Sequence, residues 1–169
     1  KIILGVYLKN QSEIDSASGW LFGGMVSNLL SSFEISNIAG YLNVNHNFSD
    51  KINSSINIRL ETNEILYTGN THNYQEDSTL VKLNSENLLT GLKVSMNYQI
   101  NKKSIFYYSI AKGYKTGGIN QNPYLPSNYT TYNPEYNYNY EIGFKTFTET
   151  MNSQFSIFYL DREDQQVNI

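Results

Sequence analysis

Tyr107-Tyr-Ser-Ile-Ala-Lys-Gly-Tyr-Lys-Thr-Gly-Gly-Ile-Asn120 is the most informative run in this chain of 169 residues. From Phe106 to Ala111 the even-numbered residues are apolar or aromatic, and the odd-numbered ones include a serine and an alanine. This period of two predicts a β-strand with a different environment on each face. Gly117-Gly118 then predicts a sharp change of direction, because glycine tolerates positive φ. A strand that ends in such a turn fits many β proteins.

The composition favours strands and excludes several classes of protein. The chain has 15 Tyr and 8 Phe but only 1 Trp and 3 Pro, and its mean hydropathy is −0.45. Its longest apolar run, Ile2–Leu8, is far shorter than the roughly 18 residues of a membrane-spanning helix. A helical membrane protein is therefore excluded. A membrane β-barrel remains possible, because its apolar residues alternate with polar ones.

Charge and cysteine content limit the possible partners and chemistry. The net charge is −3 and the lysines and arginines are scattered, so we expect no nucleic-acid partner. With 0 Cys, the chain has no disulfide, no thiolate metal site and no cysteine nucleophile. We expect no enzyme activity, no catalytic residues, no metal site and no cofactor.

Alternation of apolar and polar residues recurs along the chain and predicts about seven strands. The segments that alternate or are rich in strand formers are Lys1–Asn10, Asn37–Phe48, Ile52–Glu61, Leu92–Ile100, 104–112, Tyr140–Lys145 and Gln154–Leu160. Between them, Gln11–Phe33 is predicted to be a long loop, 64–87 a polar loop, and the region around Asn122–Pro126 a third loop. Short turns near residues 50, 102 and 150 alternate with these long loops.

This arrangement predicts an all-β fold, an antiparallel up-and-down meander that is part of a transmembrane β-barrel. Outer-membrane barrels have short turns on one side, long loops on the other, and spans of about 9–11 residues. A soluble sandwich also alternates, but its two ends seldom differ so consistently in loop length. The predicted apolar face comprises Leu42, Val44, Ile56, Ile58, Val94, Met96, Ile142 and Phe144, and the predicted polar face comprises Asn43, Asn57, Arg59, Glu61, Lys93 and Glu141.

Three motifs, in a fixed order, make the prediction more specific. The run 107–120 resembles a signature in the barrel of TonB-dependent outer-membrane receptors. Asn133-Pro-Glu135 followed by Tyr140-Glu-Ile-Gly-Phe-Lys145 resembles that family's Pro-Glu…Tyr-Glu-x-Gly-x-Lys. Phe158-Tyr-Leu-Asp-Arg-Glu-Asp-Gln-Gln-Val167 resembles its Phe-Tyr-x-Asp-x-x-Asp-Gln-Gln-Val. Ile119 replaces the commoner phenylalanine, and the first hundred residues match only in strand pattern.

The resemblance implies a barrel of roughly 22 strands with a plug in its lumen. Residues 1–169 would then be a partial barrel from its mid-to-late part, with the plug domain and the final strand outside this sequence. The implied function is TonB-dependent uptake of an extracellular nutrient, typically a ferric siderophore, at the bacterial outer membrane. The implied partners are outer-membrane lipids and lipopolysaccharide, the ligand, and the TonB complex acting through the plug. A passive porin and a soluble β-rich binding or adhesion domain are the alternatives.

Candidate ligand-binding residues come from the polar strand face and the loops. They are Arg59, Glu61, Tyr107, Lys115, Asn120 and Tyr124. We expect Arg59 and Glu61 to balance each other's charge. Tyr and Phe near strand ends are expected to form two aromatic girdles, with Phe48, Tyr98, Phe106 and Phe144 near the short turns and Tyr114 and Tyr159 near the long loops.

By parity, Lys112 and Lys115 should lie on opposite faces of their strand. Lys112 shares the face of Phe106 and Tyr108 and should emerge at the lipid boundary. Lys115 shares the face of Tyr107 and should point to the mouth of the lumen. A bulge at Gly113, between the two lysines, would reverse this parity.

Overall fold

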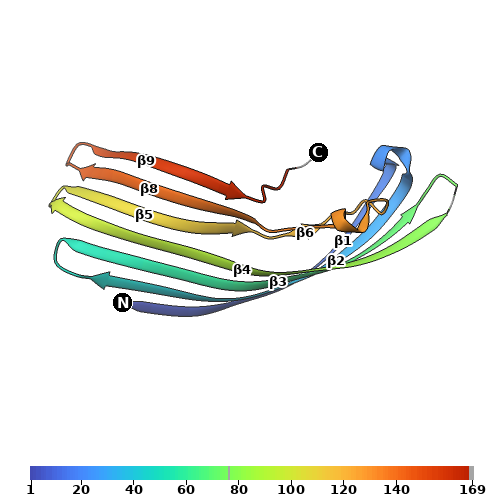
Figure 1. Ribbon diagram of the computed structural model, residues 1–169, viewed down its shortest axis with the longest axis horizontal. Coiled ribbons are helices and arrows are strands. Elements are labelled where there is room, and N and C mark those ends of the chain that lie inside the picture. The colour runs from blue at the N-terminus through green and yellow to red at the C-terminus, as the bar shows by residue number, and fades with distance from the viewer. Residues whose placement is uncertain (76, 168–169) are drawn as a thin grey trace.

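The computed structural model describes residues 1–75 and 77–167, in which the regular structure is almost entirely antiparallel β (Figure 1). One sheet of seven strands has the order β1-β2-β3-β4-β5-β8-β9. Its strands are β1 (Ile2–Leu21), β2 (Val26–Asn47), β3 (Ile52–His72), β4 (Ser78–Asn101), β5 (Ser104–Lys115), β8 (Glu135–Phe147) and β9 (Asn152–Glu163). A small hairpin of β6 (Gly118–Ile119) and β7 (Thr131–Tyr132) lies between β5 and β8, and the 3₁₀ turns are η1 (Phe22–Gly24) and η2 (Ser127–Tyr129). The predicted meander is confirmed.

No helix in residues 1–75 and 77–167 has the length and apolar character needed to cross a membrane.

The register of the ladders separates the alternating side chains onto two faces. Leu42 lies opposite Ile58, and Ile58 lies opposite Leu92. One residue along, Asn43 lies opposite Asn57, and Asn57 opposite Lys93. Residues directly opposite in an antiparallel pair share a face, so the predicted apolar and polar faces are confirmed. They are called the apolar face and the polar face below.

The apolar face carries large hydrophobic side chains that nothing in the sheet covers. Leu4 is 75% exposed and Val6 is 73% exposed. Near the short turns, one row of this face joins Tyr98, Phe106 and Phe144, as predicted for an aromatic girdle. Such a continuous apolar surface is stable only against another apolar medium or partner.

The sheet is longer at one end than the sequence pattern predicts. Strands β1 to β4 have 20, 22, 21 and 24 residues, whereas β5, β8 and β9 have 12, 13 and 12. Most of Gln11–Phe33 belongs to β1 and β2, and most of 64–87 belongs to β3 and β4, so both predicted loops are wrong. In these extensions the apolar face gains residues such as Ser36, Glu64 and Glu86, so the apolar alternation weakens while backbone pairing continues.

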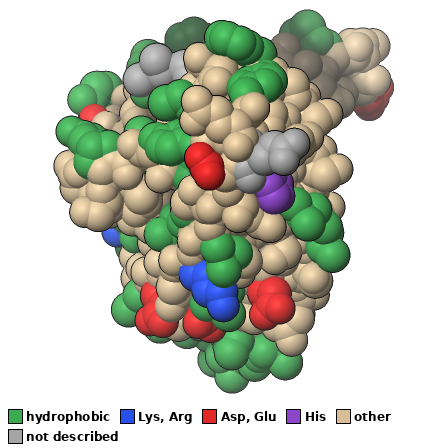
Figure 2. Space-filling model, turned by 90° about the vertical axis from the view of Figure 1, so that its right-hand side faces the viewer, with side chains coloured by type: hydrophobic (Ala, Val, Ile, Leu, Met, Phe, Trp, Pro, Cys, Tyr) green, Lys and Arg blue, Asp and Glu red, His purple; other side chains and the backbone are tan. Residues whose placement is uncertain are grey.

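The connections lie alternately at the two ends of the sheet, as predicted, but the predicted difference in length is wrong for two of them. β1 ends at Leu21 and β2 begins at Val26, and β3 ends at His72 and β4 begins at Ser78, whereas 116–134 separates β5 from β8. The short turns at 48–51, 102–103 and 148–151 lie together at the left of Figure 1. The connection at 22–25 and the ends of β3 at His72 and of β4 at Ser78 lie at the opposite end, and the chain between β5 and β8 leads towards that end. Figure 2 shows that end, where hydrophobic side chains are interspersed with polar ones.

The polar face of the extensions is buried. Tyr67 is 2% exposed and Leu89 is fully buried, although a single sheet has no second layer to cover either face. Part of the cover is the chain between β5 and β8, residues 116–134, called the inserted segment below. Its residues Thr116 to Ile119 and Tyr132 share a cavity of about 280 Å³ with Phe33 and Ile65.

Candidate ligand site

Arg59, which is half-buried, and Glu61, which is buried, form a cluster on the polar face of β3. Arg59 Nη2 lies 2.8 Å from Glu61 Oε2. Tyr114 donates its hydroxyl to the same oxygen at 2.6 Å, and Asn37 Nδ2 donates to Oε1 at 2.7 Å. Glu61 is only 7% exposed, so its carboxylate needs these donors to offset desolvation. The two charges balance each other as predicted, and the cluster joins β2, β3 and β5.

Tyr114 corrects one prediction about the aromatic girdles. The β4–β5 ladder ends at the pair Leu92–Lys112, so Tyr114 has no partner on β4. Its ring instead passes over Gly91, where an added Cβ would lie 3.3 Å from Tyr114 Cε1, and reaches Glu61 on the polar face. Alternation along β5 predicts the wrong face for Tyr114, because β5 is no longer paired with β4 at this position. The β5–β8 register itself continues without a bulge at Gly113.

Tyr107 organises a second polar cluster. Its hydroxyl donates to Glu141 Oε1 at 2.6 Å and accepts from Gln154 Nε2 at 2.8 Å. Lys145 Nζ lies 4.9 Å from the centroid of the Tyr107 ring. The ring lies across Gly143, where an added Cβ would be 2.5 Å from its Cζ. The glycine in Tyr-Glu-x-Gly-x-Lys is therefore required for close approach of the tyrosine.

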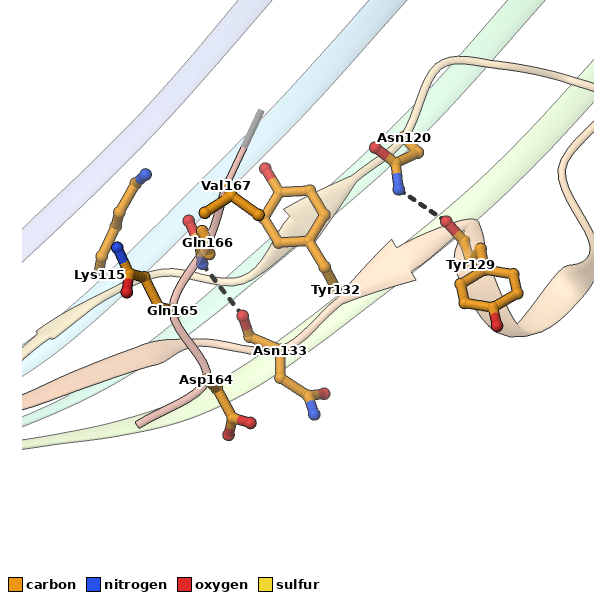
Figure 3. Close-up of a pocket in the computed structure, with 9 residues that line it drawn as sticks. All are labelled: Lys115, Asn120, Tyr129, Tyr132, Asn133, Asp164, Gln165, Gln166 and Val167. Atoms are coloured by element: carbon orange, nitrogen blue, oxygen red, sulfur yellow. Dashed lines mark hydrogen bonds between the residues drawn. The ribbon is translucent and has the colours of Figure 1, made fainter. Parts of the chain in front are cut away.

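A third group of residues surrounds a cavity of about 700 Å³ beyond the end of β5, called the mouth pocket below (Figure 3). Lys115 is exposed, and in Figure 3 its ammonium group and the Asp164 carboxylate point to opposite sides. The lining combines one cation, one carboxylate, two phenols, several amides and a valine: Lys115, Asn120, Tyr129, Tyr132, Asn133, Asp164, Gln165, Gln166 and Val167. Such a lining suits a ligand with negatively charged oxygens and aromatic or apolar parts.

The three sequence motifs meet at this pocket through Gln166. Its Nε2 donates to the carbonyl of Thr116 at 2.8 Å and to that of Asn133 at 3.0 Å. Its backbone N–H donates to Glu135 Oε2 at 3.0 Å. Thr116 belongs to the first motif, Asn133 and Glu135 to the second, and Gln166 to the third. Residues separated by up to fifty positions thus form one hydrogen-bonded junction.

The two adjacent glycines of the first motif are needed for close packing. Among the described residues, the glycines with positive φ are Gly19, Gly23 and Gly24, so the predicted φ-dependent turn at Gly117-Gly118 is wrong. Both glycines are buried. A Cβ on Gly117 would lie 2.5 Å from the Tyr132 carbonyl oxygen. The inserted segment therefore needs glycine where its two arms and the sheet come together.

The structure distributes the six predicted site residues over these places. Arg59 and Glu61 share the first cluster, Tyr107 is in the second, and Lys115 and Asn120 line the mouth pocket. Tyr124 lies outside the pocket lining, and its hydroxyl is 3.5 Å from the carbonyl oxygen of Met25. The prediction did not include Tyr114, Tyr132 or Gln166. Gln166 lies in the third motif, so that motif was the signal that could have identified it.

A family model matches nearly the whole chain. The model of the TonB dependent receptor-like β-barrel family matches residues 5–169. No curated protein sequence matches the chain significantly.

Comparison with solved structures supports the same fold. The crystal structure of the ferric yersiniabactin uptake receptor FyuA from Yersinia pestis is similar, with a TM-score of 0.83 and 18% sequence identity. The match covers 98% of the present chain and 26% of the receptor chain. At this identity the likeness concerns the fold, and the chain spans about a quarter of that receptor's length.

Proposed function

Because the chain belongs to the TonB-dependent receptor-like β-barrel family, we propose that it is a wall section of a receptor that imports an extracellular nutrient. The family implies a location in the bacterial outer membrane. The proposed ligand class is a ferric siderophore, bound and passed inward without a covalent step. In this proposal the complete protein supplies the remaining strands and a plug, and the TonB complex acts through that plug.

The two faces of the sheet support this arrangement. The apolar face would contact lipid and, near its outer edge, lipopolysaccharide. The polar face, with its Arg59–Glu61 and Tyr107–Glu141 clusters, would line the lumen. Strands β1 and β9 each have one sheet neighbour, so both would pair with further strands in a closed barrel. Closure is required because unpaired backbone groups are costly in lipid.

The mouth pocket is the observation that carries the ligand proposal. Lys115 supplies a positive charge for an anionic chelate, and Tyr129 and Tyr132 supply aromatic surface beside amide donors. The pocket lies beyond the end of the short strands, on the side away from the short turns. In an outer-membrane barrel that side faces outward, where a ligand would arrive.

The two alternatives are less consistent with the molecule. A soluble adhesion domain would cover its apolar face, whereas side chains such as Leu4 are 75% exposed. A passive porin shares the alternating strands but would not be expected to carry the three motifs that Gln166 joins.

Uptake by the complete receptor tests the proposal. The receptor is expressed in iron-starved cells without other siderophore receptors, and uptake of radiolabelled iron from a panel of ferric siderophores is measured with and without TonB. We expect TonB-dependent uptake that Lys115→Glu lowers and Lys82→Glu leaves unchanged, since Lys82 lies on the opposite face of the sheet. TonB-independent passage of unrelated small solutes would instead support the porin alternative.

A further inference from the structure

The inserted segment lies across the polar face of the sheet. Thr116 to Ile119 share a cavity with Phe33, Ile35 and Ile65 of strands β2 and β3. Further along, Tyr124 reaches the carbonyl of Met25, in the turn between β1 and β2. The segment therefore covers surface that belongs to strands distant from it in the sequence.

One side chain fastens both ends of this segment. Gln166 lies after β9, outside the segment, and its Nε2 bonds to Thr116 at one end and to Asn133 at the other. Each bond goes to a backbone carbonyl, so side-chain substitutions at 116 or 133 leave both acceptors in place. Gln166 is thus the residue through which the closure of the segment can be altered.

One buried polar atom below the segment has no hydrogen-bond partner among the described residues. Asn63 is 3% exposed, and its Oδ1 has no hydrogen-bond partner among the described residues. It lies opposite Asn87, whose Oδ1 would be 2.9 Å from a Cβ on Gly117. A buried acceptor without a partner disfavours the closed arrangement, and lifting the segment would expose it to water.

The two hydrogen bonds from Gln166 Nε2 lie where a ligand in the mouth pocket could reach them. Gln166 and Asn133 line the mouth pocket together with Lys115. An anionic oxygen that accepts a hydrogen bond from Gln166 Nε2 competes directly with the carbonyls of Thr116 and Asn133, and a charged acceptor forms the stronger bond.

We propose that residues 116–134 form a gate across the mouth of the barrel and that the Gln166 side chain is its latch. The location at a barrel mouth rests on the proposed function. A ligand bearing negatively charged oxygens releases the latch by taking over the Gln166 donor. The gate then lifts from the polar face and opens the path below the pocket.

Cysteine labelling without any ligand tests the latch. The chain contains 0 Cys, so Ile119→Cys gives a single reporter in this part of the receptor, at a position inside the cavity beneath the segment. The rate of its reaction with a membrane-impermeant maleimide is measured on the complete receptor in intact cells. Gln166→Glu keeps the side-chain shape and replaces both N–H donors by a carboxylate oxygen. We expect the rate to rise about five-fold or more, because two hydrogen bonds are lost.

Gln99→Glu is the matched control. Gln99 Nε2 also donates to a backbone carbonyl, that of Asn101 at 2.6 Å, but it lies at the opposite end of the sheet, and its substitution should leave the rate unchanged. Gln166→Met, which keeps the length and has no donor, is measured in parallel and should give the same rise. If the Gln166→Glu receptor does not assemble, the labelling rate of the Gln166→Met receptor is used to test the latch.

A labelling rate within about two-fold of the parent in the folded Gln166 variants would overturn the latch, since lost hydrogen bonds of ordinary strength change a population by more than that. Because no ligand is present, this result would leave the receptor proposal untouched. Failure of siderophore uptake would likewise leave the labelling result intact.

Discussion

At the scale of single residues, the motif positions serve mainly to bring side chains and backbone close together. Gly143 allows the Tyr107 ring to lie across β8, and Gly117 allows the two arms of the inserted segment to approach each other at Tyr132. Tyr107 in turn presents its hydroxyl to Glu141 at 2.6 Å. The glycines and the tyrosine of these motifs are therefore needed for close packing, which the assignment of strands alone does not explain.

Gly143→Ala should destabilise the receptor by about 1–3 kcal/mol, because a methyl group at this position collides with the Tyr107 ring. The measurement is the midpoint of thermal unfolding, followed by the change in gel mobility of samples heated to a series of temperatures. Combining the change with Tyr107→Ser should recover part of the loss, since the ring is then absent. Equal losses with and without the ring would show that the collision is not the cause.

Lys112 and Lys115 should have different effects although they are three residues apart. Lys112 Nζ donates to Thr90 Oγ1 at 3.2 Å and lies 4.2 Å from the centroid of the Tyr136 ring, on the apolar face, while Lys115 lines the mouth pocket. Lys115→Glu should weaken binding of an anionic siderophore, with a loss that shrinks as salt rises. Lys112→Glu should mainly reduce insertion or outer-membrane integrity.

Binding to the purified receptor at several salt concentrations, together with the amount of receptor in the membrane, separates these effects. Equal, salt-independent losses of binding for both substitutions would contradict the assignment of the two lysines to opposite faces.

At the scale of elements, the long extensions of β1 to β4 are held by backbone pairing with little help from apolar side chains. Within them, Glu64 and Glu86 lie directly opposite each other on the same face. Like charges in such a pair destabilise a ladder. This repulsion identifies a local weakness in the β3–β4 extension.

Glu86→Lys should therefore raise stability by about 0.2–1 kcal/mol by pairing opposite charges across the ladder. The thermal midpoint should rise at low salt, and the gain should diminish at high salt. A fall in the midpoint at low salt would indicate that these residues are not opposite each other in the extended ladder.

The apolar part of each strand could be predicted from sequence, and the extensions could not. Residues 52–60 and 92–100 alternate because one face is apolar throughout. Beyond them, the apolar face gains polar residues such as Glu64 and the polar face gains apolar ones such as Tyr67 and Leu89. Alternation therefore no longer separates strand from loop, although the ladders continue to His72 and Ser78.

The candidate site was predicted only in part for a related reason. Strand parity correctly placed Arg59 and Glu61 on the polar face. It failed for Tyr114 because β5 leaves β4 at Lys112, and it could not identify Gln166 because that residue follows the last strand. Contacts between distant segments have no periodic signal in the sequence.

At the scale of the whole molecule, the chain is an open sheet with two unlike faces and two outer strands, β1 and β9, that each have one neighbour. An apolar face without a covering layer, a polar face with charged clusters, and two outer strands that each lack a second neighbour all agree with a section of a larger membrane barrel. The central claim is that the apolar face contacts lipid and the polar face lines an aqueous lumen.

Spin labels at two adjacent positions of β4 test this claim most directly. Val94 lies opposite Ile56 on the apolar face, and Ser95 lies opposite Ser55 on the polar face. Each is replaced by cysteine in the complete receptor, labelled and reconstituted in lipid, and its collision rates with oxygen and with a water-soluble nickel chelate are compared. The label at 94 should collide mainly with oxygen, which concentrates in lipid, and the label at 95 should collide less with oxygen than the label at 94. Strong collision of the label at 94 with the nickel chelate, or the reverse order of oxygen collision at the two positions, would contradict the account.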